Sequence, residues 1–189
     1  KQPVDWTKVE MFHLDEYVGL PITHIASFRK YLTERFVEKV PLKAAHFVNG
    51  EGDVKANIAK LTKELHEFPI DLGVIGIGEN GHIAFNDPPA DFDNDEAYIV
   101  VNLDDACKRQ QVGEGWFATM DDVPKQAVTM TPKQILKSER IISIVPHKVK
   151  ANAVRSTVYG DLSPMVPATL LKQKPDWILY LDKASAELL

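Results

Sequence analysis

Short apolar runs alternate along the chain with longer segments in which apolar residues recur at helical spacing. The short runs predict strands at residues 9–14, 45–48, 72–77, 98–103, 127–130, 140–145 and 177–181. Helical spacing predicts helices at residues 28–40, 54–65 and 148–159 and from residue 183 onward. This alternation favours an α/β fold with a doubly wound, mostly parallel sheet and helices on both faces, a Rossmann-like three-layer arrangement. We expect residues 1–189 to form a single domain.

The run at residues 72–77 is the clearest strand prediction. It lacks polar alternation, which is expected for a strand that is buried on both faces at the centre of a parallel sheet. The four residues that follow, Gly78 to Gly81, must then form a turn.

Composition and charge exclude several classes of protein. With 189 residues, of which 44% are hydrophobic and 26% charged, the chain can bury a substantial core. No apolar run approaches the roughly 18 to 20 residues that a membrane helix needs, and the first residues lack a signal-like pattern, so we expect a cytoplasmic protein without a membrane partner. The net charge of -5, with scattered lysines and arginines, gives no basic face for nucleic acid. Cys107 is the sole cysteine, which rules out an internal disulfide and a multi-thiolate metal site.

Three segments follow predicted strands at the edge where ligands bind in open α/β sheets. They are residues 15–17, residues 78–87 and residues 147–148. Their convergence on one edge predicts a small-molecule site.

The glycine spacing at residues 76–81 also fits a dinucleotide-binding loop, with Asp104 as the acid that would bind a ribose. Such a loop should open a long helix, whereas Asp87 is followed by two prolines, which cannot continue one. We therefore favour the alternative, in which Gly78 and Gly81 let the backbone turn sharply and bring a sugar close to Asn80 and His82.

Residues 76–88, Gly-Ile-Gly-Glu-Asn-Gly-His-Ile-Ala-Phe-Asn-Asp-Pro, closely resemble the signature of the glucosamine-6-phosphate deaminase/isomerase family. Residues 12–20, Phe-His-Leu-Asp-Glu-Tyr-Val-Gly-Leu, resemble the second signature of that family. The related 6-phosphogluconolactonases share the fold and the Gly-His turn, but usually continue differently after the histidine and have arginine near the position of Tyr17. The run at residues 85–88 favours the deaminase side.

The resemblance implies an enzyme that opens the ring of glucosamine 6-phosphate, moves a proton from C2 to C1 through an enolamine, and releases fructose 6-phosphate and ammonia. By matching position, Asp15 is the base at C2 and His82 moves a proton at the ring oxygen, without a metal or an organic cofactor. Asn80 and Asp87 complete the implied catalytic group. Asn80 can orient His82 by a hydrogen bond but cannot titrate.

The same resemblance implies substrate contacts at Gly78 and Gly81 and phosphate contacts at Lys148 and Arg109. Lys148 matches the phosphate-binding lysine of the family, and a helix N-terminus there would also favour an anion. Arg109 would replace an arginine that family members carry just before an aromatic pair.

Three departures from the family pattern bear on this prediction. Asp87 stands where most members have glutamate, and Gly115 precedes the Trp-Phe pair where members have the phosphate-contacting arginine. Members also begin with a strand and a Gly/Ser/Thr-rich phosphate loop, and nothing similar precedes Val9. We expect the chain to lack that strand and loop, so that the domain at 1–189 is incomplete at its N-terminal end.

Two alternative functions remain open from the sequence. One is a lactonase in which His82 activates water on a sugar lactone and Asp15 need not contact C2. The other is a sugar-phosphate sensor without catalysis, although such regulators carry a helix-turn-helix that this sequence does not show. In each case the partner is a phosphorylated sugar, and a homo-oligomer is compatible with the sequence.

Overall fold

The computed structural model describes residues 4–189. The strands are β1 (Glu10–Phe12), β2 (Asp15–Tyr17), β3 (Ala44–His46), β4 (Leu72–Val74), β5 (Tyr98–Asn102), β6 (Gln126–Met130), β7 (Arg140–Val145) and β8 (Ile178–Leu181). The α-helices are α1 (Phe28–Arg35), α2 (Val54–His66), α3 (Asp105–Gly113), α4 (Pro132–Leu136) and α5 (Ala151–Tyr159). Short 3-10 helices are η1 (Trp6–Lys8), η2 (Val37–Lys39), η3 (Met120–Asp122), η4 (Lys148–Lys150) and η5 (Pro167–Gln173).

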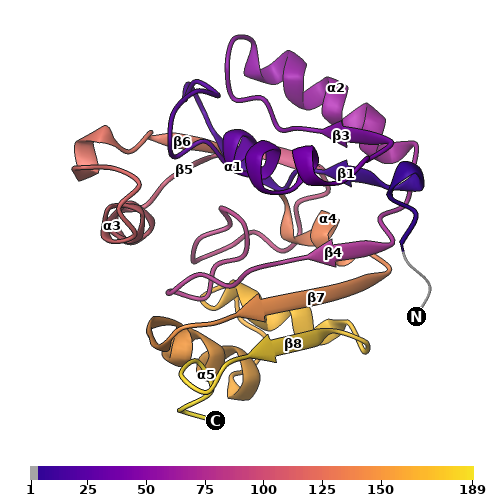
Figure 1. Cartoon of the computed structure of the whole chain (residues 1–189). Coiled ribbons are helices and arrows are strands. Elements are labelled where there is room, and N and C mark those ends of the chain that lie inside the picture. The colour runs from indigo at the N-terminus through magenta and orange to yellow at the C-terminus, as the bar shows by residue number, and fades with distance from the viewer. Residues whose placement is uncertain (1–3) are drawn as a thin grey trace.

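The strands form three small sheets with helices packed around them (Figure 1). Strand β1 pairs with β3, and β7 pairs with β4 and β8, all in parallel. Strand β6 pairs with β2 and β5 in antiparallel orientation. The predicted α/β class with largely parallel pairing is confirmed, and the strands are divided among three sheets.

The predicted strand at 9–14 is divided in two by a change of partner. After β1, the backbone N–H of His13 still donates to His46 O at 2.9 Å. One residue later, Leu14 O accepts a hydrogen bond from Met130 N at 2.8 Å, and the chain continues as β2 beside β6. Asp15 therefore lies on a strand of the antiparallel sheet, because the chain leaves the parallel pair just before it.

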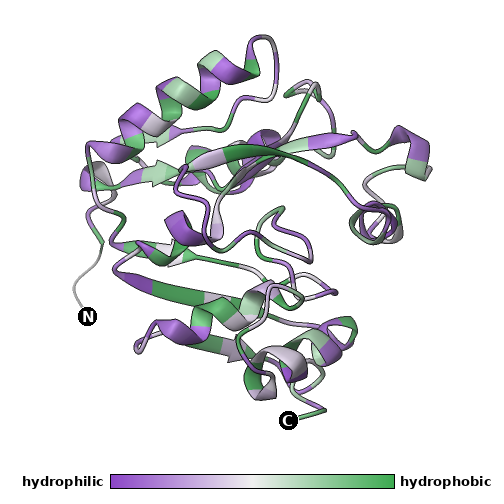
Figure 2. Ribbon diagram, turned by 180° about the vertical axis from the view of Figure 1, so that it is seen from behind, coloured by the Kyte–Doolittle hydropathy of each residue, from purple (hydrophilic) through white to green (hydrophobic). Residues whose placement is uncertain are grey.

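Strand β4 is shorter and more exposed than the sequence predicted. It ends at Val74 and lies at the edge of its sheet, next to β7. Leu72 and Val74 are 48% and 58% exposed, whereas Gly73 and Ile75 are buried. The prediction of a strand buried on both faces is wrong, because residues 4–189 cover only the face that carries Ile75. Figure 2 shows hydrophobic colour along the strands of this sheet.

Several helix boundaries also differ from the predicted ones. The helix predicted at 28–40 ends at Arg35, and a separate 3-10 turn, η2, follows. Val40 is extended, as expected for a residue that precedes proline. The helix predicted at 148–159 begins as η4 and becomes α-helical only at Ala151. The residues after Lys183 form turns and not the predicted helix.

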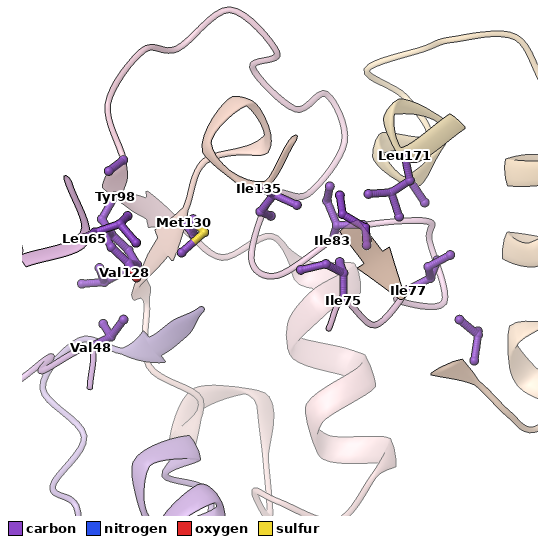
Figure 3. Packing of buried hydrophobic residues seen from close by; sticks show 14 of the residues in the cluster. Val48, Leu65, Ile75, Ile77, Ile83, Tyr98, Val128, Met130, Ile135 and Leu171 are labelled. Atoms are coloured by element: carbon purple, nitrogen blue, oxygen red, sulfur yellow. The ribbon is translucent and has the colours of Figure 1, made fainter. Parts of the chain in front are cut away.

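The main hydrophobic core joins the antiparallel and the parallel sheets. Figure 3 shows Tyr98, Val128 and Met130 of the antiparallel sheet on one side, and Ile75 and other residues next to the parallel sheet on the other. Ile135 of α4 lies between the two groups and is fully buried. The core thereby fixes the relative position of β6 and of the chain that follows β4. No helix within residues 4–189 is both long and apolar enough to cross a membrane.

Candidate active site

The first candidate acid-base residue, Asp15, begins strand β2. It lies opposite Thr129 in the antiparallel register between β2 and β6. Its side chain is half-buried. Because side chains alternate along a strand, Asp15 and Tyr17 share one face and Glu16 points to the other.

The second candidate, His82, lies in the tight turn that follows the chain from β4. The N–H of Gly78 donates to His82 O at 2.9 Å, and the N–H of Gly81 donates to Gly78 O at 3.1 Å. Gly81 has a φ of +84°, which an L side chain rarely adopts. This turn does not open a helix, which removes the structural basis of the dinucleotide-binding alternative.

Gly78 leaves the space that the His82 ring occupies. A Cβ atom at position 78 would lie 2.1 to 2.3 Å from three atoms of the imidazole, well inside van der Waals contact. Glycine is required here because the ring packs directly on the backbone of the turn. In the structure, Gly78 positions His82, and its predicted contact with a substrate stays a prediction.

The imidazole of His82 is held by two oxygens on its Nδ1 side. Asn80 Oδ1 lies 2.6 Å and Asp87 Oδ1 lies 3.2 Å from Nδ1. Asn80 also accepts from the backbone N–H of His82 at 3.0 Å and donates through Nδ2 to Asp87 Oδ1 at 3.1 Å. The structure thus brings together Asn80, His82 and Asp87, as the sequence predicted. Nε2 is the ring nitrogen left to exchange a proton with a ligand.

Asp87 supplies the negative charge of this group. Burial alone would raise the pKa of Asp87, but the hydrogen bond and charge of His82 and the bond from Asn80 outweigh it and hold the pKa below its usual range. The side chain is 10% exposed, and Oδ2 is buried without a hydrogen-bond partner. Although aspartate is one methylene shorter than glutamate, Asp87 still reaches the histidine.

Thr129 connects the turn to the strand of Asp15. Its hydroxyl oxygen accepts a hydrogen bond from the backbone N–H of Phe85 at 3.0 Å. Asn86 Nδ2 donates to Met130 O at 2.9 Å on the same strand. Since Thr129 is the residue opposite Asp15 on β6, the His82 turn and Asp15 are anchored at the same point of the sheet. This convergence is the structural basis of a common site.

The protein environment raises the pKa of Asp15 above the value of a carboxyl group in water. Desolvation by burial, and secondarily the charge of Glu16, raise the pKa of Asp15 to about 7. The side chain retains partial contact with solvent while protein surrounds it on most sides. A carboxyl group with a pKa near neutrality can both accept and return a proton at physiological pH.

Cys107 is a buried residue whose thiol is affected by both acids. Burial raises the pKa of its thiol, and Asp87, Asp104 and Asp15 raise it further. The thiol therefore stays protonated. Asp104, the ribose-binding candidate of the rejected alternative, caps α3 by accepting from Cys107 N at 2.6 Å.

Arg109 points away from the group around His82. It lies two residues after the buried Cys107 on α3 and is exposed, on a different side of the helix. The neighbouring residue, Gln110, contacts the His82 turn instead. It accepts a hydrogen bond from the backbone N–H of Glu79 at 3.3 Å and donates one to Glu114 at 2.8 Å.

Lys148 and Lys150 have different surroundings. Lys148 lies in η4 with its side chain 76% exposed and 3.2 Å from Glu187. Lys150, at the N-terminus of α5, is half-buried. Burial lowers the pKa of Lys150, against the opposing charges of Glu114 and Glu79. Of the two lysines, Lys150 is therefore the one on which the charge of Glu79 in the His82 turn acts, and the sequence analysis did not single it out.

Neither of two surface cavities contains the acid-base group. One, of about 540 Å³, lies between α2 and β5 and is lined by Ile58 and Tyr98 among others. The other, of about 180 Å³, is lined by residues of the α1 N-terminus and by Trp116. The candidate site is therefore defined by the acid-base residues Asp15 and His82 and not by either cavity. Within residues 4–189 no group of three or more His, Cys, Asp or Glu side chains is arranged to hold a metal ion.

Comparison with known families gives a match over most of the chain. The family of glucosamine-6-phosphate isomerases and 6-phosphogluconolactonase matches residues 1–179. A glucosamine-6-phosphate deaminase of Oenococcus oeni is 38% identical over 187 residues, which are 98% of this chain and 78% of that protein. A glucosamine-6-phosphate deaminase of Listeria welshimeri is 36% identical over 190 residues, which are 100% of this chain and 80% of that protein.

Solved structures give the same picture. A monomeric glucosamine-6-phosphate deaminase superposes with a TM-score of 0.86 at 32% identity, over 94% of this chain and 74% of that one. A 6-phosphogluconolactonase of Thermotoga maritima superposes with a TM-score of 0.75 at 18% identity, over 95% of this chain and 75% of that one. The second likeness is one of fold alone.

Proposed function

This chain belongs to the family of glucosamine-6-phosphate isomerases and 6-phosphogluconolactonase, and we propose that it converts glucosamine 6-phosphate into fructose 6-phosphate and ammonia. The observation that carries the proposal is that Thr129 lies opposite Asp15 on β6 and also accepts a hydrogen bond from Phe85, three residues after His82. A coupled assay that detects fructose 6-phosphate tests it directly. The absence of product at saturating glucosamine 6-phosphate, from protein that is folded, would refute it.

In the first step, His82 acts at the ring oxygen of the sugar. Nε2 of the imidazole delivers a proton to that oxygen while the C1 hydroxyl loses its proton, so that the C1–O bond breaks and an open-chain aldehyde forms. The Asn80 and Asp87 oxygens on Nδ1 fix the orientation of the ring, and the charge of Asp87 stabilises the imidazolium between proton transfers. Asn80, being neutral, contributes position alone.

In the second step, Asp15 acts at carbon. Its carboxylate takes the C2 proton of the open-chain amino aldehyde while the C1 oxygen gains a proton from water, which forms the enolamine, and the protonated carboxyl then returns a proton to C1. The resulting C2 iminium is hydrolysed by water to the ketose and ammonia. The pKa of about 7 leaves a substantial carboxylate fraction at neutral pH and makes the carboxyl form a usable acid.

We assign the substrate phosphate to Lys150 in place of Lys148. The assignment is supported by the half-buried position of Lys150 at the start of α5 and by its place beside Glu79 of the His82 turn. Lys148, by contrast, pairs with Glu187 in solvent. A cytoplasmic location forms part of the proposal, since a phosphorylated sugar does not cross a membrane unaided.

Replacing Lys150 by methionine should raise KM for glucosamine 6-phosphate by about 10 to 100-fold, because a charge-assisted hydrogen bond to phosphate is lost. Lys148→Met is the matched control and should change KM by less than about twofold, because its charge lies in solvent. Steady-state kinetics of both variants check the assignment. The reverse ranking would return the phosphate contact to Lys148.

Replacing Gly78 by alanine should reduce kcat/KM by about 100-fold or more, because the new Cβ displaces the imidazole of His82. Gly76→Ala is the control, since a Cβ there meets nothing within 4 Å. The two variants are compared by kcat/KM and by thermal unfolding. Equal activities would show that the ring position in the structure is not the active one.

The lactonase alternative remains chemically available to His82, because lactone hydrolysis needs a base for water and no base at C2. It predicts release of acid from 6-phosphogluconolactone and no dependence on Asp15. Assaying wild-type protein and Asp15→Asn with this lactone separates the two activities.

A further inference from the structure

A buried carboxylate lies directly behind Asp15. Glu16 is fully buried on the opposite face of β2. It accepts hydrogen bonds from the Ser27 hydroxyl at 2.7 Å and from the backbone N–H groups of Phe28 at 3.3 Å and Arg29 at 2.9 Å. It also accepts the N–H of Tyr17 at 2.9 Å. The first residues of α1 are thus hydrogen-bonded to the side chain of the residue next to Asp15.

Arg29 completes this group from the other side. It is 7% exposed, and its Nε lies 3.4 Å from Glu16 Oε2. Its terminal nitrogens donate to Asn49 Oδ1 at 2.9 Å and to Glu51 Oε1 at 2.6 Å. The ion pair therefore connects β2 and α1 with the loop that follows β3.

The other titratable groups around Asp15 are neutral at neutral pH. Burial raises the pKa of the Tyr17 hydroxyl, the Tyr98 hydroxyl and the Cys107 thiol. His13, on the same segment, is held neutral because burial, with the charge of Arg29 second, lowers its pKa to about 3. Beyond Cys107 stands Asp87, whose charge is paired with His82. Glu16, the residue after Asp15, and Arg29 thus form a buried ion pair next to the base in the sequence.

We propose that Glu16 and Arg29 are positioning residues for the reaction: the ion pair behind β2 holds the strand that carries the base and sets the electrostatic field in which Asp15 gains and loses its proton. The proposal rests on the proposed function in assigning Asp15 as the base. It adds a role for two residues that do not contact substrate.

The test uses two variants that change the charge in opposite directions. Glu16→Gln removes a negative charge, so Asp15 should ionise more easily, and the pH at which kcat/KM falls to half should move down by about one unit. Arg29→Gln leaves Glu16 unpaired, so the same pH should move up by a similar amount. The double variant should return the profile close to that of wild type. A purely structural role would move both single variants in the same direction, and that result would overturn the proposal.

Two further variants are controls that separate a loss of stability from an effect of charge. Glu51→Gln removes the outer partner of Arg29, whose side chain is 41% exposed, and should lower the unfolding temperature without moving the pH profile, because solvent screens that charge. Arg29→Lys keeps the charge and loses the forked geometry, so it should also lower stability while leaving the profile in place. A shifted profile in either variant would contradict the assignment of the effect to the charges of Glu16 and Arg29.

A direct titration separates this proposal from the proposed function. The carboxyl carbon of Asp15, observed by ¹³C NMR in protein with labelled aspartate and assigned with Asp15→Asn, reports its protonation without any substrate. Opposite shifts of that titration in Glu16→Gln and Arg29→Gln support the ion pair even if the protein has no deaminase activity. Unchanged titrations would overturn the proposal even if the deaminase activity is established.

Discussion

Asp15→Asn should lower the rate of fructose 6-phosphate formation from glucosamine 6-phosphate by about 100 to 10,000-fold, which is the usual contribution of a general base. Asparagine has nearly the shape of aspartate, but it cannot take the C2 proton. Steady-state kinetics at pH 8 measure the effect, because Asp15 is largely ionised above its pKa of about 7.

Thermal unfolding is the control for Asp15→Asn. A carboxyl group whose pKa is raised in the folded state destabilises that state progressively as pH rises from the unfolded pKa through the folded one. At pH 8 the neutral asparagine should therefore leave the protein at least as stable as wild type. Loss of activity together with loss of stability would point to a structural role, and retained formation of fructose 6-phosphate would show that Asp15 is not the base at C2.

His82→Gln should also reduce kcat by about 100 to 10,000-fold when the substrate is the closed-ring sugar. Glutamine can fill part of the space of the imidazole, but it cannot carry a proton between the ring oxygen and solvent. Kinetics of the variant give the effect, and His66→Gln, which replaces an exposed histidine, is the control. A kcat within about twofold of wild type would show that His82 does not act in ring opening.

The parts of the site that lie in one continuous segment were predictable from the sequence. One short segment, residues 80–87, carries Asn80, His82 and Asp87. Their hydrogen bonds to one another therefore depend little on how distant strands pair. Thr129 was not predictable, because a threonine in a β-strand is common and its role comes from a backbone contact with Phe85, far away in sequence.

Lys148 and Lys150 show how an error in a helix boundary affects the choice of a candidate site residue. The helical spacing placed the start of the helix at Lys148, but that residue begins a 3-10 turn, and the α-helix begins at Ala151. Sequence patterns locate helix ends to within about two to four residues. The two lysines are only two residues apart, yet Lys148 is exposed to solvent and Lys150 is half-buried.

The strand pairing was less predictable than the strands. Periodicity identified an apolar run at 9–14, but it contains no glycine or proline where the chain changes from β3 to β6 as its partner. The antiparallel pairing of β6 with β2 and β5 likewise depends on contacts between distant segments, which no local pattern encodes. The fold class was therefore recoverable, and the division into three sheets was not.

The fate of the C2 proton is the most direct test of Asp15 as the base at C2. Glucosamine 6-phosphate is followed by ¹H NMR in D₂O with wild-type protein and with Asp15→Asn. If Asp15 removes the C2 proton, the C2–H signal of the amino sugar should disappear in step with the formation of fructose 6-phosphate in wild type and should persist in the variant. Loss of that signal at the wild-type rate in Asp15→Asn would contradict that assignment.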